Sequence, residues 1–500
     1  MTTNTLPRPR NRALVAGLLT LACLASGLAA VIGDGNPAIA LAPVAAVAAL
    51  AALWIVPVAS TLLVLIFLGL TLDTSRDAAG LWQSPVAPLG RFLMENLNKT
   101  VPVESLKVTV FSLIVGLLLV KSWSLRASAA GVARRQGPAG PVWRAITIAL
   151  AATFGLAAYG VLRGGDIQMV NLEVQNFVLA IAVAYLIAVT FDRRHIRVLC
   201  GIVIGAACIK AVMALWVAYV FVVPEGAVLA FATTHGDSML FASAVALLVI
   251  FAYEGRAYFR SPWMIPPALA LIFAGVAANN RRLAWMEIMF AVVTLAAITP
   301  QTKGKRFLVR AALFASPLLL VYVAAGWNST SKVFAPMKLI RSVSDGKTDR
   351  STLTRDVENF NLIATFSQSR LVGSGLGQPY AEVIKGDDIS HAFAAYRYVP
   401  HNSVLWLWAA GGLVGFTAIW GAPVTAIFAG ARAFKFAVAN EQRVFAFFAL
   451  STVQTYMLQC WGDMGFGDLK TTFILGGGLG VAMHFARAAC GPRRELPLAT

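Results

Sequence analysis

The chain has 500 residues, of which 58% are hydrophobic and only 13% are charged, and its formal net charge is +18. This composition excludes an ordinary soluble domain, in which about 25% of the residues are charged. Apolar runs long enough to cross a bilayer recur from Ala13 to His484, so we expect an all-α, polytopic helical membrane protein. The first run follows Arg8, Arg10 and Arg12. Because many further runs follow it, we interpret it as an uncleaved first helix and not as a signal peptide.

The apolar runs predict about twelve to fourteen transmembrane helices. The second and third runs are short and are separated by Pro57, so they are compatible with a single hairpin. The predicted spans cover residues 13–32, 38–56, 58–72, 107–122, 145–162, 176–191, 198–223, 238–253, 263–279, 283–299, 307–326, 404–430, 444–462 and 471–487.

The positive charge is concentrated in short clusters between the apolar runs. These clusters are Arg134 with Arg135, Arg193 with Arg194 and Arg197, Arg256 with Arg260, Lys303 with Lys305 and Arg306, Arg432 with Lys435, and Arg493 with Arg494. They fall in every second loop, as the positive-inside rule requires of cytoplasmic loops. This pattern predicts that both termini are cytoplasmic, and it argues against a nucleic-acid partner.

The five cysteines give no sign of a disulfide framework or a metal site. Cys23, Cys200, Cys208, Cys460 and Cys490 lie in apolar runs or next to the basic tail, and no pair has the spacing of a zinc site. We therefore expect no metal site at these cysteines, and we expect no cofactor.

Two outer loops, 73–106 and 327–402, are long. The first contains the run Arg91-Phe-Leu-Met-Glu-Asn-Leu, which predicts a short amphipathic segment at the membrane interface. In the second, Ser351 and Thr352 predict the start of a helix that runs to about residue 369, with an apolar stripe along one side. This loop ends at Val399-Pro400-His401-Asn402-Ser403, directly before an apolar span.

His401 is the first candidate for chemistry. The ordinary pKa of a histidine is about 6.5, so it can accept a proton from a hydroxyl group at neutral pH. Asn402 or Ser403 would cap the next helix and hold the histidine at the membrane surface. Taken alone, however, a lone histidine is more often a structural residue that forms hydrogen bonds within its loop.

Arg281 and Arg282 are an exception to the charge rule, because they form a tight turn on the outer side. Paired guanidinium groups suit a diphosphate, since each can hold two oxygens. Alternatively, they contact lipid phosphates or pair with Glu287, one helical turn further along.

Weaker candidates surround these residues. Gly373, Gly375 and Gly377 predict a turn whose amides could face an anion, although an ordinary flexible turn has the same sequence. Arg355 lies in the first turn of the predicted loop helix, where a positive charge is unfavourable. Lys210 lies within a span and needs a partner or a cavity. His235 is a weak second candidate for the base.

The order of these elements resembles that of the O-antigen ligase superfamily, which includes O-antigen ligases and polysaccharide polymerases. The resemblance covers roughly residues 235–430, and it is strongest from Gly373 to Gly415, including Pro400-His401-Asn402. The turn Asn280-Arg281-Arg282-Leu-Ala-Trp285 is similar to the family's Ser-Arg-Gly-x-Trp pattern, and Trp285 favours Arg282 as the equivalent arginine. Family members usually have another outer arginine before the His235 region. This chain has none there, so Lys210 or Arg163 would have to take its place.

The resemblance implies a metal-independent, inverting glycosyltransferase at the periplasmic face of the bacterial inner membrane. The donor would be a glycan on undecaprenyl diphosphate, and the acceptor would be lipid A-core or a growing polysaccharide. His401 would be the base, Arg282 or Arg281 would hold the diphosphate, and Arg355 would lie near it. We expect amino-terminal helices over 1–234, the ligase-like core over 235–430, and carboxy-terminal helices with a basic tail over 431–500.

A transporter or flippase of lipid-linked glycans is the alternative. The number of spans and the intramembrane Lys210 favour it. The absence of a repeat between the two halves of the sequence, and the scarcity of intramembrane acidic residues, argue against it.

Overall fold

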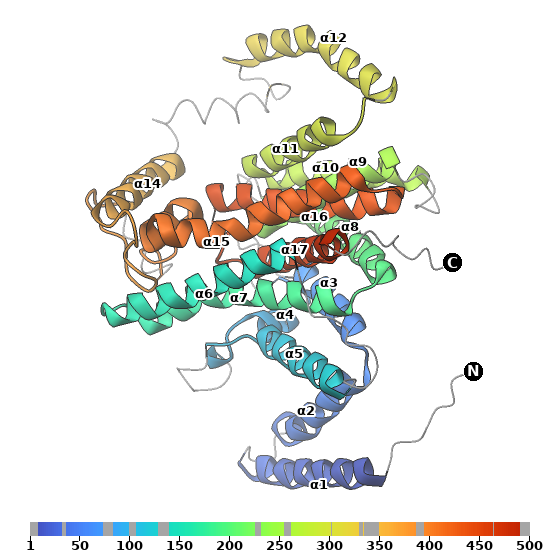
Figure 1. Ribbon diagram of the computed structural model, residues 1–500, viewed down its shortest axis with the longest axis vertical. Coiled ribbons are helices and arrows are strands. Elements are labelled where there is room, and N and C mark those ends of the chain that lie inside the picture. Colours follow the sequence, from blue (N-terminus) through green and yellow to red (C-terminus); the bar gives the residue numbers. More distant parts are fainter. Residues whose placement is uncertain are drawn as a thin grey trace.

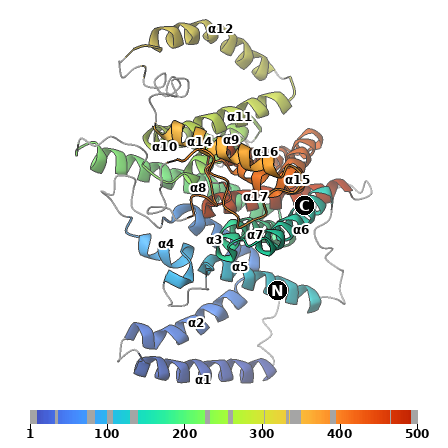
Figure 2. The ribbon, with the colours of Figure 1, turned by 90° about the vertical axis from the view of Figure 1, so that its left-hand side faces the viewer.

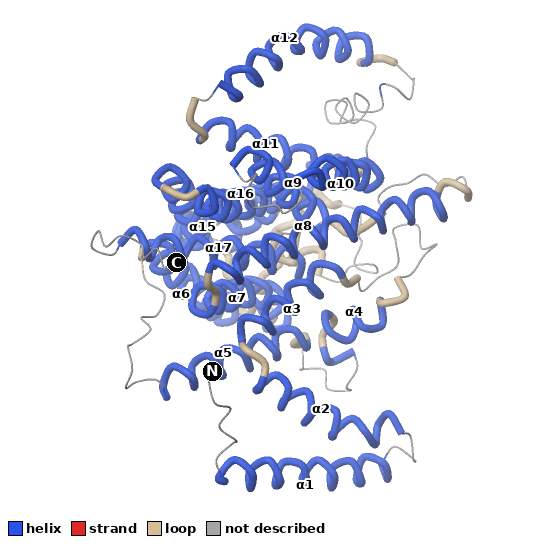
Figure 3. Tube along the Cα trace, turned by 90° about the vertical axis from the view of Figure 1, so that its right-hand side faces the viewer, coloured by secondary structure: helices blue, strands red, loops and turns tan. Residues whose placement is uncertain are grey.

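The computed structural model describes residues 9–32, 37–73, 84–99, 107–128, 140–225, 232–254, 262–301, 303–329, 334, 350–386, 395–463 and 465–490. Over this part of the chain the structure consists of helices joined by turns, and no strand is present (Figure 3). The predicted all-α class is therefore confirmed.

Each predicted span coincides with a helix. The amino-terminal half contains α1 (Pro9–Ile32), α2 (Pro37–Ile55), α3 (Val58–Thr71), α4 (Ala87–Met94), α5 (Val110–Ser128), α6 (Pro141–Leu162), α7 (Ile167–Thr190) and α8 (Arg193–Trp216). The rest contains α9 (Gly236–Glu254), α10 (Ile265–Asn279), α11 (Arg282–Ile298), α12 (Lys303–Gly326), α14 (Arg350–Gln368), α15 (Ser403–Phe436), α16 (Asn440–Gly462) and α17 (Leu469–Cys490). Within the described ranges, six helical segments are long and apolar enough to cross a membrane, so this is a multi-pass membrane protein.

The body of the molecule is a bundle in which α7, α15, α16 and α17 pack closely, with α3, α6, α8 and α9 around them (Figures 1 and 2). Large apolar side chains such as Phe241, Phe447 and Phe473 are fully buried inside it. The helices α1 and α2 pack on each other at one side of this bundle, and α12 lies beyond α11 at the other side (Figure 1).

The helix ends that the charge pattern assigns to the cytoplasm contact one another. Arg197 at the start of α8 donates to Glu441 of α16 over 3.1 Å. Arg443 of α16 donates to Glu254 at the end of α9, also over 3.1 Å. The opposite end of the bundle carries α14 (Figure 1), and we call it the α14 end.

The two predicted segments in the long outer loops are both helical where the structure describes them. The segment around Arg91 is α4, and the predicted loop helix is α14. The second loop is described over 327–329, 334, 350–386 and 395–402 only. The apolar stripe of α14 faces the protein only in part: Phe360 and Ile363 are about half exposed, whereas Phe366 packs on Trp408 of α15. Glu358 and Asn361 are buried.

Candidate active site

His401 lies at the α14 end and is held there by Glu358 of α14. The His401 backbone N–H donates to Glu358 Oε2 over 3.0 Å, and His401 Nδ1 lies 3.3 Å from the same oxygen. An ionised carboxylate only accepts hydrogen bonds, so Nδ1 must carry the proton of a neutral ring in this pair. The lone pair is then on Nε2. The ring is 28% exposed, whereas Glu358 is buried, so the histidine can meet a ligand while its partner fixes its orientation.

The next two residues fix the position of His401 relative to the bundle. Asn402 caps α15, because its side-chain oxygen accepts from the backbone N–H of Leu405 over 3.1 Å, which confirms the predicted cap. Its amide nitrogen donates to Asn359 of α14 over 3.1 Å. Ser403 Oγ donates to the carbonyl of Asp463, at the end of α16, over 3.2 Å. The start of α15 is thus tied to both α14 and α16.

Arg281, one of the predicted arginine pair, is coupled electrostatically to this site. It is the N-terminal cap of α11, after Asn280 makes the turn with a φ of 51°. Burial lowers the pKa of Arg281 to about 10, Asp463 opposes this shift, and the positive charge of Arg355 adds to it. Arg281 is therefore charged at neutral pH, and it lies within electrostatic range of Arg355 and Asp463.

Arg355 lies on α14 three residues before Glu358, so both project from the same side of that helix. This spacing places the positive charges of Arg281 and Arg355 in the same region as the His401–Glu358 pair. Arg282 is the first residue of α11. Three residues later, Trp285 stacks on Phe273 of α10. The coupling to Arg355 and Asp463 supports Arg281 as a member of this site, and the stacking of Trp285 shows no role for Arg282 in it.

Glu287 does not act as the neutralising partner that the alternative interpretation of the arginine turn requires. Its side chain is fully buried, and both of its carboxyl oxygens lack a hydrogen-bond partner among the described residues. The positive charge at the start of α11 is therefore balanced from Asp463 and not by a hydrogen bond to Glu287.

His235 forms a second histidine–carboxylate pair at the same end. His235 Nδ1 contacts Asp463 Oδ2, and 40% of the histidine side chain is exposed, whereas Asp463 is almost completely buried. Asp237, two residues after His235, points into the bundle instead. Its carboxylate accepts from the backbone N–H of Thr234 over 3.1 Å.

Asp237 belongs instead to a buried network of two lysines and two aspartates, Lys210, Lys470, Asp73 and Asp237, which we call the Lys–Asp network. Lys470 Nζ lies 2.8 Å from Asp73 and 2.9 Å from Asp237, and Lys210 Nζ lies 2.5 Å from Asp73. Burial alone would raise the pKa of Asp73, but the two ammonium groups outweigh burial and lower it to about 2. Lys210 is fully buried in this network, so its predicted contribution to substrate binding is not supported.

The glycine-rich turn also has a role different from the predicted one. The helix α15 is broken at Gly412, whose φ is 57°. The break leaves the carbonyls of Ala409 and Ala410 without helical partners, and the amides of Ser374 and Gly375 donate to them over 2.9 Å each. A Cβ at Gly373 would lie 2.4 Å from the Ala410 oxygen, so only glycine fits there.

The remaining amides of this turn are also occupied by protein acceptors. Gly377 donates to the buried carboxylate of Glu173 over 2.7 Å, and Gly373 donates to Ser369 over 2.9 Å. Binding of an anion by these amides is therefore not supported, and the turn instead locks the loop onto α15. Arg163 covers the ring of Tyr159 at 5.5 Å and reaches the carbonyl of Ser374 at 3.5 Å.

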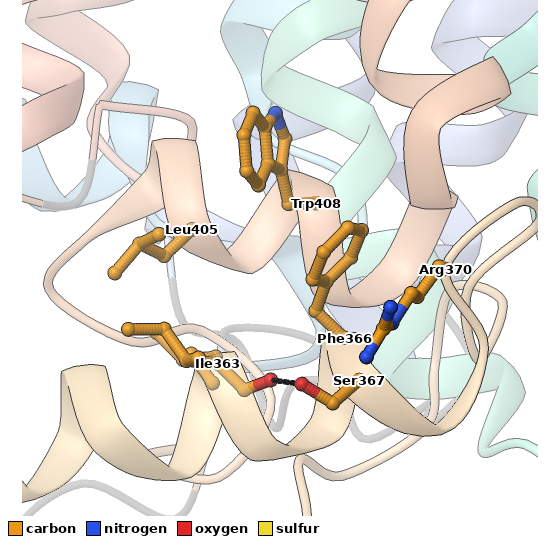
Figure 4. A pocket seen from close by; sticks show the side chains of 7 residues that line it. Ile363, Phe366, Ser367, Arg370, Leu405 and Trp408 are labelled. Atoms are coloured by element: carbon orange, nitrogen blue, oxygen red, sulfur yellow. Dashed lines mark hydrogen bonds between the residues drawn. The ribbon is translucent and has the colours of Figure 1, made fainter.

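A groove of about 400 Å³ lies between α14 and α15 (Figure 4). Leu362 and Leu405, each four residues after one member of that pair, contribute to its wall. It is lined by Leu362, Ile363, Phe366, Ser367, Arg370, Leu405 and Trp408. The groove is apolar apart from Ser367 and Arg370, so an apolar surface begins next to the polar site.

The site lies where three helices begin. The starts of α9, α11 and α15 meet through Asp463, which contacts His235, faces Arg281 and accepts from Ser403. The positive ends of three helix dipoles therefore point toward one region, an arrangement that favours an anion. No group of three or more metal-ligating side chains occurs in the described ranges.

Two members of this site, Glu358 and Asp463, were not identified from the sequence. Glu358 and Asp463 give no local signal, because each is a single acid whose partner is more than 40 residues away. Arg281 carries a signal, but the sequence gives more weight to its neighbour.

A comparison with curated proteins yields no match. Residues 267–420, just under a third of the chain, match the family described as O-Antigen ligase. The matched segment contains Arg281, Arg355, Glu358, the glycine-rich turn, His401 and the break in α15. The resemblance that the sequence motifs indicate is thus confirmed: residues 267–420 of this multi-pass membrane protein are similar to the O-antigen ligase family.

Proposed function

We propose that this chain transfers a glycan from undecaprenyl diphosphate to an acceptor hydroxyl group. The acceptor is either lipid A-core or a growing polysaccharide chain. The observation that carries the proposal is the geometry of His401: Glu358 holds Nδ1, and the charges of Arg281 and Arg355 lie in the same region. A base beside a concentration of positive charge suits a reaction in which a hydroxyl loses a proton and a diphosphate leaves.

His401 serves as the general base in this proposal. Its Nε2 takes the proton of the acceptor hydroxyl while the oxygen attacks the anomeric carbon of the donor glycan. The bond between that carbon and the diphosphate oxygen breaks in the same step, so the configuration at the carbon inverts. Glu358 fixes the tautomer that leaves Nε2 unprotonated and stabilises the imidazolium ion that forms.

Arg281 and Arg355 hold the diphosphate of the donor. The leaving group gains negative charge as the bond breaks, so preorganised positive groups stabilise the transition state more than the bound substrate. The starts of α9, α11 and α15 add the positive ends of their dipoles. The apolar groove between α14 and α15 gives a lipid-linked substrate an apolar surface beside the polar site (Figure 4).

The site faces the periplasm and the termini face the cytoplasm in this proposal. The alternation of basic clusters along the sequence supports that orientation. The contacts of Arg197 with Glu441 and of Arg443 with Glu254 agree with it, because all four residues are at helix ends assigned to the cytoplasm.

The test is the activity of His401→Ala in purified protein in lipid nanodiscs. The donor is an undecaprenyl-diphosphate glycan, offered in parallel with lipid A-core and with a second molecule of the donor as acceptor. We expect the rate to fall about 100- to 10,000-fold, the usual contribution of a general base. His484→Ala, near the far end of α17, is the matched control and should keep the wild-type rate. Wild-type activity in a folded His401→Ala protein would falsify the mechanism. The acceptor that is used decides between ligase and polymerase.

A further inference from the structure

We propose that the break in α15 carries a phospholipid-binding site, in which Arg370 binds the phosphate of a lipid from the surrounding bilayer. Four exposed apolar residues beside it contact the acyl chains, and they are Leu371, Val372, Leu413 and Val414. We call these five residues the break patch. The inference goes beyond the proposed function and does not depend on it, because binding of a bilayer lipid requires neither donor nor acceptor.

Arg370 is a positive charge that the described part of the protein does not neutralise. Its side chain is exposed, and no described residue forms a hydrogen bond or ion pair with its guanidinium group. It lies at the edge of the groove between α14 and α15, beside Phe366 and Ser367 (Figure 4). The Ser367 hydroxyl donates to the Ile363 carbonyl over 2.8 Å. Arg370 is therefore the polar group at this edge that can bind a phosphate, which a guanidinium does through two parallel hydrogen bonds.

The break in α15 fixes the position of Arg370. Because the helix turns sharply at Gly412, the N–H groups that follow need acceptors from outside it. The Leu413 N–H donates to the Arg370 carbonyl over 2.8 Å. The Val414 N–H donates to the Leu371 carbonyl over 3.1 Å. The cation and its apolar neighbours are thus held against α15 before any ligand binds.

The apolar part of the break patch is strongly exposed. Leu371 is 65% exposed and Val414 63%, and Leu413 and Val372 are about half exposed. Single exposed apolar side chains are ordinary, but adjacent ones from two segments of the chain mark a surface that another molecule covers. For a membrane protein, acyl chains are the apolar molecules at hand.

The length of α15 places the break patch at the depth of the lipid phosphates. About 20 residues of α-helix cross the hydrocarbon of a bilayer. Counted back from Arg432, the first basic residue of α15, this length reaches the break at Gly412. The break then marks one surface of the hydrocarbon, where an arginine reaches phosphates while its apolar neighbours contact the chains. A free phosphate would leave those neighbours in water, so the order of charge and apolar surface fits a phospholipid.

The test measures binding of phosphatidylglycerol to the delipidated full-length protein in detergent by native mass spectrometry. We expect Arg370→Gln to weaken binding about tenfold or more, as the loss of a hydrogen bond to a charged group does. Arg370→Lys keeps the charge without the fork and should recover part of the affinity. Leu371→Ser changes an exposed side chain and should weaken binding several-fold. Diacylglycerol, which lacks the phosphate, should bind the wild type and Arg370→Gln equally weakly.

Lys385→Gln is the matched control, because Lys385 is an exposed cation of the same loop. It follows Ile384, which donates to Asn361 about two helical turns before the end of α14. This variant should bind phosphatidylglycerol like the wild type.

Two competitors separate a phospholipid from other sources of phosphate. Glycerol 3-phosphate has no acyl chains and should not displace phosphatidylglycerol, and farnesyl diphosphate, which mimics the donor, should displace it less well than phosphatidylglycerol itself. Equal affinity of the wild type and folded Arg370→Gln would overturn the inference, as would a wild type that prefers phosphatidylglycerol no more than diacylglycerol. Efficient displacement by glycerol 3-phosphate would show a free-phosphate site, and stronger displacement by farnesyl diphosphate would assign Arg370 to the donor. Either result would overturn the phospholipid site and leave the proposed function intact.

Discussion

The α14 end of the protein contains two groups of charged residues that differ in their exposure to the solvent. In the Lys–Asp network, two lysines and two aspartates are all buried, and their charges cancel. In the site around His401, the positive charges of Arg281 and Arg355 lie near a histidine that is partly exposed. The charges of the first group cancel inside the protein, whereas the second group is partly open to the solvent at His401.

This difference in exposure separates the buried network from the proposed substrate site. Lys210 is the more unusual residue in the sequence, because it lies inside a span. Its positive charge is paired with Asp73 and Asp237 inside the protein. Buried ion pairs are costly to disrupt but contribute little net stability compared with an apolar core. We infer that the network fixes how α3, α8, α9 and α17 fit together beneath the site.

The largest effect is expected from removing one member of the network. Lys470→Met leaves Asp73 and Asp237 with only Lys210, and an uncompensated buried charge costs about 3–5 kcal/mol. The loss is a large part of the roughly 5–15 kcal/mol that stabilises a typical domain. Thermal unfolding in nanodiscs should show a much lower midpoint for Lys470→Met.

Lys435→Met is the control for that change, because Lys435 is exposed near the end of α15, where it lies over the ring of Phe436. It should unfold at the wild-type temperature. The double variant Lys470→Met, Asp73→Asn leaves one lysine and one aspartate, and it should recover part of the loss. Equal unfolding midpoints for Lys470→Met and Lys435→Met would show that the network does not stabilise the bundle.

Glu358→Gln should have the opposite profile, with activity lost and stability retained. The amide keeps the shape of the side chain but removes the charge on the Nδ1 side of His401. Loss of a hydrogen bond to a charged group costs about 1.5–3 kcal/mol, which corresponds to a decrease in kcat of roughly 10- to 100-fold. Steady-state rates should show this decrease with little change in KM. Asp356→Asn, an exposed position on the same helix, should be neutral, and an equally active Glu358→Gln enzyme would exclude Glu358 as the residue that positions His401.

The sequence predicts the fold well because membrane spans are defined by length and apolar content. Each predicted span is a helix, and α14 begins within two residues of the expected start. The environment of α14 was less predictable. Its apolar residues Phe360 and Ile363 are exposed, and its polar residue Asn361 is buried because it holds the backbone of Val383 and Ile384. Periodicity identifies the helix but not which side faces the protein.

The site was predictable only in part, and the missing part is long-range. His401 and Asn402 can be recognised from the local sequence, because they lie next to each other at the start of α15, which Asn402 caps. Glu358 and Asp463 are 43 and 62 residues from His401, and only the packing of α14 and α16 brings them to it. The glycine-rich turn shows a further limit. A sequence that permits an anion-binding turn permits equally well a turn whose amides donate to a broken helix.

Acid should weaken the Lys–Asp network through Asp73. The folded-state pKa of Asp73 is about 2, below the unfolded value of 3.8. Asp73 therefore stabilises the fold fully above pH 3.8, and this contribution is lost as the pH falls toward 2. The shift corresponds to about 2 kcal/mol. The difference in unfolding midpoint between the wild type and Asp73→Asn should shrink over this interval, and a difference that stays constant from pH 5 to pH 2 would contradict the assignment.

The smallest effect is expected at Asn402, which joins the start of α15 to the loop helix α14. Asn402→Ala removes the cap of α15 and the hydrogen bond to Asn359. Loss of a cap costs about 0.5–2 kcal/mol. Because Asn402 also holds α14 beside His401, we expect a small decrease in the unfolding midpoint together with a loss of activity of a few-fold. Asn402→Ser, which can still cap the helix but cannot reach Asn359, should recover the stability and not the activity. Recovery of both by serine would mean that the Asn359 contact has no part in placing His401.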